Sequence, residues 1–240
     1  NSPNTLTAEM TAQGPGYSVT IDPSGGQVLV DGVPTTSVST FNWQANTIHL
    51  LDPDSGYNHK AGSRRIFQQW SDGNKDDPRS VTVTAGVTYA AQWKTQHRLK
   101  VVSPFGIPQG DGWYDEGTTA SFGTVTYVEH QNRTRRIFQQ WSGDYSGSPA
   151  SSTIVMDGPK TVTAEWETRY EIIIAVSPAN AGSTNPPVGS DHYASGSTII
   201  VSQTPNSGFT FSKWNVNGAD STNVPTFVMT LSSPFTLTAI

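Results

Sequence analysis

Short runs of alternating or continuous apolar residues recur along the chain, and each run ends near a proline. They occupy residues 17–21, 99–102 and 172–176. Alternation with a period of two, β-branched residues and punctuation by proline and glycine are typical of β-strands. No long stretch of the sequence combines a helical period with helix caps. The pattern therefore predicts an all-β protein.

An eight-residue segment occurs twice without change. Residues 64–71 and residues 135–142 both read Arg-Arg-Ile-Phe-Gln-Gln-Trp-Ser. A looser third copy, residues 208–214, reads Gly-Phe-Thr-Phe-Ser-Lys-Trp. Because eight consecutive identities do not arise by chance in a chain this short, the sequence predicts tandem modules.

Three short turns keep the same frame as the repeated segment. An aromatic residue is followed three positions later by Asn-Thr, Gly-Thr or Gly-Ser, within residues 43–47, 114–118 and 193–197. Asn46 stands where the other two copies have glycine, and Asn is the non-glycine residue that best tolerates a positive φ. The exchange predicts a left-handed backbone conformation at this turn.

Each module closes on a strand-like motif, at residues 89–93, 162–166 and 237–240. These landmarks divide the chain into an N-terminal extension at residues 1–16, module 1 at 17–96, module 2 at 97–168 and module 3 at 169–240.

The predicted fold class is all-β, a tandem array of three small β-sandwich-like modules forming a rod. A β-grasp-like sheet is the alternative, and the lack of a helix disfavours it. The linkers at residues 94–96 and 167–169 are very short and contain neither glycine nor proline. We therefore expect neighbouring modules to be stiffly docked.

Composition narrows the function classes. Charged residues make up 14% of the 240 residues, the net charge is −5, and no basic stripe is present, which disfavours a nucleic-acid partner. Seven Trp, eight Tyr and nine Phe supply enough apolar surface to disfavour disorder. The longest apolar run, residues 172–176, is too short for a membrane span, and the absence of cysteine excludes a disulfide scaffold.

The repeated aromatic residues are expected to form the module cores. Phe and Trp lie three positions apart, which places them on opposite sides of a regular strand unless a bulge intervenes. A sugar-stacking platform is the alternative, but recurrence in the same frame favours a core. Trp113, in a glycine-rich loop at 106–117, is the better candidate for a surface contact. The predicted core residues are Phe67, Trp70, Trp93, Phe138, Trp141, Trp166, Phe211 and Trp214.

The N-terminal residues 5–10 match the closing motif 161–166 at four of six positions, and they resemble the closing strand of a module that is otherwise missing. One interpretation is that the chain was cut from a longer array. Another is strand donation, in which this segment completes a sheet edge of a neighbouring subunit and builds a filament; a third is that it folds back on module 1. The donated residues would be Thr5, Leu6, Thr7, Ala8 and Met10.

Two surface sites can be proposed from short motifs. Asp72, Asn74 and Asp76 have the spacing of the first three ligands of a calcium loop, but Asp77 replaces the expected glycine and Val83 the final acid. A solvated acidic turn is therefore the favoured interpretation, and no other cofactor is expected. Asn132 begins a glycosylation sequon.

No catalytic motif is found, and paired acids do not recur in equivalent places of the modules, so we expect no enzymatic activity. The paired arginines of the repeat, at 64–65 and 135–136, are replaced in module 3 by Gly208 and Phe209. Their loss indicates a contact that is specific to modules 1 and 2, between modules or between subunits.

The pattern of turn, Phe-x-x-Trp-Ser strand and closing motif resembles the divergent internalin B-type repeats of bacterial and archaeal surface proteins. The matching positions are Tyr114, Gly117, Phe138, Trp141, Ser142, Gly143, Met156 and 162–166. Module 3 departs by having Asn215 after its tryptophan, and module 1 has Trp43 and Asn46 at the turn.

The resemblance implies an extracellular or cell-surface protein whose repeats serve as spacers, stalks or adhesive elements. Its partners would be neighbouring repeats or identical subunits. The alternative is a carbohydrate-binding module appended to a secreted enzyme, with surface glycans as partners. Saturable changes in tryptophan fluorescence on addition of polysaccharides would favour that alternative.

Overall fold

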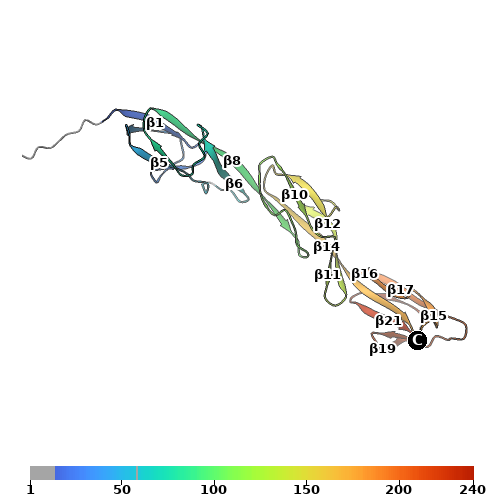
Figure 1. The fold of residues 1–240 in the computed structure, drawn as a ribbon. Helices are drawn as coiled ribbons and strands as arrows, with labels where there is room; N and C mark the ends of the chain where they lie inside the picture. The colour runs from blue at the N-terminus through green and yellow to red at the C-terminus, as the bar shows by residue number, and fades with distance from the viewer. Residues whose placement is uncertain (1–13, 58) are drawn as a thin grey trace, which may run out of the picture. The chain divides into compact units, whose positions relative to one another are not determined.

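The computed structural model describes residues 14–57 and 59–240. These residues form 21 β-strands and no helix (Figure 1), which confirms the all-β prediction for the described part of the chain. The strands are β1 (Gly16–Asp22), β2 (Val28–Val30), β3 (Val33–Thr35), β4 (Ser39–Gln44), β5 (Ile48–Pro53), β6 (Ser63–Trp70), β7 (Arg79–Thr82), β8 (Val87–Val102), β9 (Gly112–Asp115), β10 (Thr119–Gly123), β11 (Tyr127–His130), β12 (Thr134–Gly143), β13 (Ser151–Val155), β14 (Lys160–Val176), β15 (Gly182–Asn185), β16 (Gly189–Ala194), β17 (Thr198–Pro205), β18 (Trp214–Val216), β19 (Ala219–Thr222), β20 (Thr226–Thr230) and β21 (Phe235–Ala239).

By their contacts the residues fall into two compact units. One unit holds the described residues up to 99 together with residues 112–119 and 155–160, and the other holds residues 100–111, 120–154 and 161–240. The first unit thus contains module 1 with two short segments of module 2, and the second contains the rest of module 2 with module 3.

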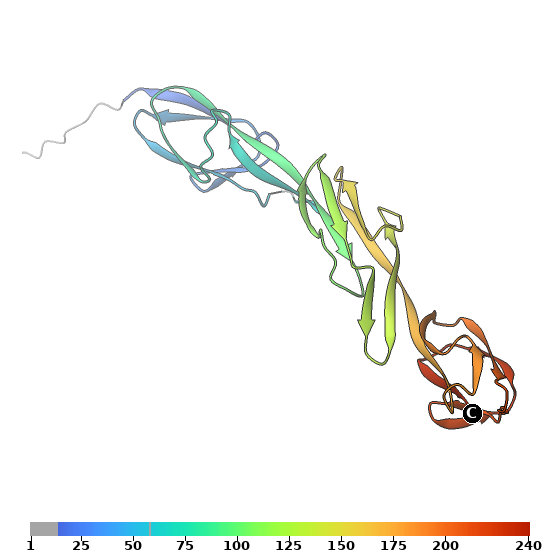
Figure 2. The ribbon, with the colours of Figure 1, turned by 45° about the vertical axis from the view of Figure 1, so that its right-hand side comes forward.

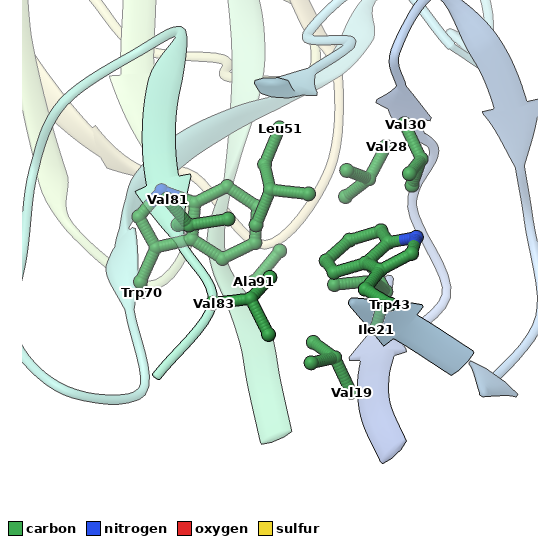
Figure 3. Close-up of a cluster of buried hydrophobic side chains, with 10 residues drawn as sticks. All are labelled: Val19, Ile21, Val28, Val30, Trp43, Leu51, Trp70, Val81, Val83 and Ala91. Carbon is green, nitrogen blue, oxygen red and sulfur yellow. The ribbon is translucent and has the colours of Figure 1, made fainter. Parts of the chain in front are cut away.

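Module 1 is built from two sheets with a hydrophobic core. In the first sheet β1 pairs antiparallel with β4 and parallel with β8, and β8 pairs antiparallel with β6. The second sheet has the order β3-β2-β5-β7. The core draws on both sheets, with Val19 and Ile21 from β1, Trp70 from β6 and Leu51 from β5 (Figure 3). This two-sheet arrangement is sandwich-like.

Module 3 repeats this architecture. Here β14 pairs antiparallel with β16 and parallel with β21, while β21 pairs antiparallel with β18. The second sheet has the order β15-β17-β20. Its core includes Ile172 from β14, Val201 from β17 and Trp214 from β18. In both modules, therefore, the first strand and the last strand lie side by side and run in the same direction.

Module 2 supplies equivalent strands. Its repeated segment is β12, which pairs antiparallel with β14 and with β11. Strands β10 and β13 form a separate two-stranded sheet. Phe122 of β10 and Trp141 of β12 are both buried, with ring centroids 5.0 Å apart in an edge-to-face arrangement.

The two predicted linkers are not linkers. Residues 94–96 lie inside β8, which is 16 residues long, and residues 167–169 lie inside β14, which is 17 residues long. Each is a single strand that closes one module and opens the next, and the long β14 ribbon can be followed in both views (Figures 1 and 2). Glycine and proline are absent there because both would interrupt a paired strand.

A bulge explains the spacing of the repeated Phe and Trp. The register of β6 against β8 shifts between Phe67 and Gln69, and that of β12 against β14 shifts between Phe138 and Gln140. The extra residue lets Phe and Trp meet although they are three positions apart. Their ring centroids lie 5.3 Å apart in module 1, 5.4 Å in module 2 and 5.8 Å in module 3.

The predicted left-handed turn is confirmed in all three copies. Asn46 has φ 65°, Gly117 has φ 78° and Gly196 has φ 79°. In each copy this residue's backbone N–H donates to a carbonyl at the end of the strand region that precedes the closing strand, at Val83, Met156 and Leu231 respectively. The same hydrogen bond therefore recurs in all three modules and satisfies the backbone N–H of the left-handed residue.

Candidate functional site

The repeated tryptophans occupy the most protected position of each module. Trp70, Trp141 and Trp214 are 0% exposed. A sugar stacks on an open aromatic face, so these three rings cannot form a glycan platform. The indole N–H of Trp70 donates to the Asp76 carbonyl at 3.2 Å, and that of Trp141 donates to the Pro149 carbonyl at 3.1 Å. The Trp214 indole N–H is buried without a hydrogen-bond partner.

The other predicted core residues pack around these tryptophans. Phe138 is buried, while Phe67, Trp93 and Phe211 are partly buried against the cores. Trp166 is also partly buried, and its indole N–H donates to Ser103 Oγ at 3.0 Å. In module 3 the third copy of the repeated segment, residues 208–214, enters a strand only at Trp214, the first residue of β18. Phe211 therefore packs against the core from a loop.

The proposed calcium residues hydrogen-bond among themselves. The Asn74 side chain donates to Asp76 Oδ2 at 3.1 Å and accepts from the Asp76 backbone N–H at 2.8 Å. Asp72 is held by an ion pair with Arg79 at 2.6 Å. The Arg79 hydrogen bond is the largest cause that lowers the pKa of Asp72. Within residues 14–57 and 59–240 no group of three or more His, Cys, Asp or Glu side chains is placed to hold a metal ion.

Two other predicted sites are placed as follows. Asn132 lies at the tip of the β11–β12 hairpin, is exposed, and has φ 59°. Thr134, the third residue of its sequon, is buried, and its hydroxyl donates to the Asn132 carbonyl at 3.3 Å. The strand-donation residues Thr5 to Met10 lie outside the described residues.

The paired arginines of module 1 lie beside a cavity of about 380 Å³. Strand β6 carries Arg64 and Arg65 and strand β8 carries Thr95 and His97, because Ser63 pairs with His97 and Arg65 with Thr95 in the ladder. The cavity is lined by Gly25, Lys60, Ser63, Arg64, Arg65, Thr95 and His97.

Each arginine of this cavity has a neutral partner. Arg64 donates two hydrogen bonds to Gln96 Oε1, at 2.9 and 2.8 Å, and its guanidinium lies 4.4 Å from the centre of the Trp113 ring. Arg65 donates to the Gly25 carbonyl. Trp113 lies in strand β9 and not in a loop as the sequence predicted. Its ring stacks on the guanidinium of Arg64, a cation of its own chain.

His97 is the one ionisable side chain of the cavity that is buried, at 7% exposure. Its Nδ1 lies 2.9 Å from Ser63 Oγ. Its Nε2 has no hydrogen-bond partner and lies 3.6 Å from Glu116 Oε1. The sequence carries no signal that singles out His97 or Lys60, because neither residue recurs in the other modules.

In module 2 the first of the two arginines has an acidic partner and the second lies against an aromatic ring. Arg135 forms an ion pair with Glu129, which includes a hydrogen bond of 2.7 Å from its Nε. Arg136 lies over the ring of Phe105, 4.7 Å from its centre. Tyr170 takes the ladder position that His97 has in module 1, since it pairs with Thr134 as His97 pairs with Ser63.

None of the described residues forms a helix that could cross a membrane. The fold and its repeated cores define a class of protein: an all-β protein made of tandem modules, each anchored by a buried tryptophan.

The family follows from comparison with known proteins. Residues 109–169 and 172–240, more than half of the chain, match the family described as Divergent InlB B-repeat domain, and the chain belongs to this family. The two matched segments correspond to modules 2 and 3. Repeats of this family are typical of surface proteins. No curated protein and no solved structure matches the chain.

Proposed function

We propose that the chain is a non-catalytic, tension-bearing spacer of a secreted or surface protein. The observation that carries this proposal is the parallel pairing of the first and last strands in a module. Residues 19–22 of β1 pair in parallel with residues 87–90 of β8, and residues 172–176 of β14 pair in parallel with residues 235–239 of β21.

Parallel pairing of the terminal strands has a mechanical consequence. The chain enters module 1 at the start of β1 and leaves along β8 in the same direction, so it exits at the opposite end of this strand pair. Tension along the chain therefore slides the two strands past each other. All ladder hydrogen bonds of the pair then resist together, whereas peeling the strands apart would break them one at a time.

The junctions support the same role. Because β8 and β14 each run from one module into the next without a loop, tension passes through paired backbone. At the second junction Thr168 pairs with Arg136, and its carbonyl accepts a hydrogen bond from the Ser195 N–H. Stalk-like spacing is a role that such continuous strands fit.

Single-molecule pulling in two directions tests the proposal. The chain contains no cysteine, so pairs of introduced cysteines give unique attachment points. Gly14→Cys with Gln92→Cys loads the β1–β8 pair in shear, and Gly14→Cys with Ala85→Cys peels the same pair from one end. We expect a clearly higher rupture force for the first pair. Equal forces would refute the tension-bearing role. The two variants share one attachment point and differ only in the other, so each serves as the control for the other.

The filament version of this role makes a separate prediction. In modules 1 and 3 the closing-strand position is filled by β8 and β21, so a donated strand would have to add to a sheet edge such as β4 or β16. Deletion of residues 1–13 would then abolish fibres seen by electron microscopy. Fibres that persist after the deletion would rule strand donation out.

A further inference from the structure

We propose that module 1 contains an anion-binding pocket that takes an acidic sugar unit of a glycan. The pocket is the 380 Å³ cavity lined by Lys60, Arg64, Arg65 and His97, with the hydroxyls of Ser63 and Thr95. This binding site is additional to the spacer role and does not depend on it.

The charge of the pocket is not balanced by its own residues. Among the described residues no carboxylate lies within ion-pair distance of Lys60, Arg64 or Arg65. Of the nearby acids, Asp115 is engaged by Lys94 at 3.0 Å and Asp157 by Lys160 at 2.7 Å, while Glu116 approaches Nε2 of His97, the nitrogen that does not contact Ser63. Three cations that share one hollow without a carboxylate form a site for an anion.

The guanidinium groups are held in place for such a ligand. Arg64 is fixed between Gln96 and the Trp113 ring, and Arg65 is tied to the Gly25 carbonyl. Each guanidinium has five N–H donors, so both retain donors for a carboxylate or sulfate. A pre-positioned cation loses little side-chain entropy on binding.

The size and polarity of the pocket favour a sugar over a bare ion. Its volume lies at the small end of the ~300–1,000 Å³ range that is usual for ligand pockets. The hydroxyls of Ser63 and Thr95 both donate and accept hydrogen bonds, as sugar hydroxyls require. His97 lies behind these hydroxyls, with its Nδ1 2.9 Å from Ser63 Oγ. A small ion would leave these groups unused.

In module 2 the same eight-residue segment has different neighbours. Glu129 forms an ion pair with Arg135, and the Phe105 ring lies against the guanidinium of Arg136. Tyr170 has the ladder position that His97 has in module 1. The first arginine of the identical eight-residue segment thus has a carboxylate partner in module 2 and none in module 1. Arg65 and Arg136, which hold the same repeat position, therefore provide a matched pair of variants.

Isothermal titration of the full chain tests the site. The probes are trigalacturonate, a sulfated trisaccharide, the trigalacturonate with its carboxyls reduced to alcohols, inorganic sulfate and a hexaglutamate peptide. We expect saturable binding of at least one acidic trisaccharide that weakens with added salt. Arg65→Gln should weaken it about tenfold, the loss of roughly one charge-assisted hydrogen bond, and Arg136→Gln should leave it unchanged.

The other outcomes overturn the proposal. Failure of both acidic trisaccharides to bind removes the site, and equal binding of the reduced trisaccharide removes the role of the anion. Binding of sulfate or hexaglutamate as tight as that of the trisaccharide shows a general anion patch or a peptide site in place of a sugar site. Equal losses in Arg65→Gln and Arg136→Gln place binding elsewhere. A melting temperature equal to that of the unmodified chain shows that each variant is folded, and Lys60→Gln is the second variant should Arg65→Gln unfold.

Discussion

Three tryptophans fill the same buried position, yet they differ in the hydrogen bonding of the indole nitrogen. The indole N–H groups of Trp70 and Trp141 each reach a carbonyl in the loop that follows the strand. In module 3 a tight β18–β19 hairpin replaces that loop, and Trp214 has no acceptor. A buried donor without a partner costs stability, so module 3 keeps the ring for its apolar area alone.

This difference predicts unequal effects of one substitution. Trp70→Phe removes ring volume and leaves the Asp76 carbonyl without its donor, whereas Trp214→Phe removes volume together with the unpaired N–H. We expect Trp214→Phe to be less destabilising by about 1–3 kcal/mol. Native-state hydrogen exchange of β6 and β18 measures this module by module. A larger loss for Trp214→Phe would contradict the assignment.

The stability contributed by Asp72 at the β6–β7 turn should depend on pH. The hydrogen bond and ion pair with Arg79 lower the pKa of this carboxyl below its usual range. Because the folded-state pKa lies below the unfolded one, the pair contributes stability above the unfolded pKa, and this contribution is lost as the pH falls through the folded pKa. In an NMR titration Arg79→Gln should return the Asp72 pKa toward its ordinary value, while Arg98→Gln should not. An Asp72 pKa that does not move would show that Arg79 is not the cause.

At the scale of the element, the bulge decides which residues reach the core. Strand β12 pairs Phe138 with Trp166 and Gln140 with Glu165, so Gln139 is the extra residue. Against β14, Phe138 and Trp141 therefore lie two positions apart, opposite Trp166 and Ala164, and share one face. If β12 had no bulge, the same sequence beyond Phe138 would slip by one residue. Such a slip moves every following side chain to the other face.

Insertion of one residue after Gln139 and substitution of Gln139 should therefore have very different effects. Insertion of an alanine displaces the later half of β12 by one residue, so it should expose Trp141 or force a loss of pairing, at a cost of about 3–5 kcal/mol, as for removal of a large aromatic side chain from a core. Gln139→Ala keeps the backbone and changes an exposed side chain, so we expect little effect. Hydrogen exchange of β12 distinguishes the two. Equal protection in both variants would mean that the bulge does not set the register.

At the scale of the whole molecule, the array is joined by strands that belong to two modules at once. Thr168 lies in the middle of β14 and pairs with Arg136. In the sequence Thr168 stands between the closing motif of one module and the opening strand of the next, as a linker residue would. In the structure its backbone is part of a β-ladder.

Proline at this junction should open it. Thr168→Pro removes a backbone N–H from the paired strand and restricts φ, so we expect faster proteolytic cleavage near residues 166–170. Thr168→Val keeps strand propensity and should resist the protease as the unmodified chain does. A proline variant that is cleaved no faster would show that pairing at the junction contributes nothing to its protection.

Much of the candidate site could not be predicted from the sequence. The duplicated arginines were recognisable as a contact specific to modules 1 and 2, but what each arginine meets depends on residues far away in the chain. Arg65 meets Gly25, and Arg64 meets Gln96 and Trp113. A sequence signal does exist: position 58, seventy-one residues before Glu129, is Asn, so module 1 lacks the acid that neutralises Arg135.

The sequence by itself determined the all-β class, the repeat frame and the left-handed turn at Asn46, and it left open whether a bulge lies between Phe and Trp. These features are local, and they follow from side-chain periodicity and from the φ that a residue tolerates. Only the tertiary structure decided the parallel pairing of the first and last strands, the merging of linkers into β8 and β14, and the open charge beside His97. Those features depend on which distant segments become neighbours, because strand pairing and charge neutralisation are made between residues that the sequence keeps apart.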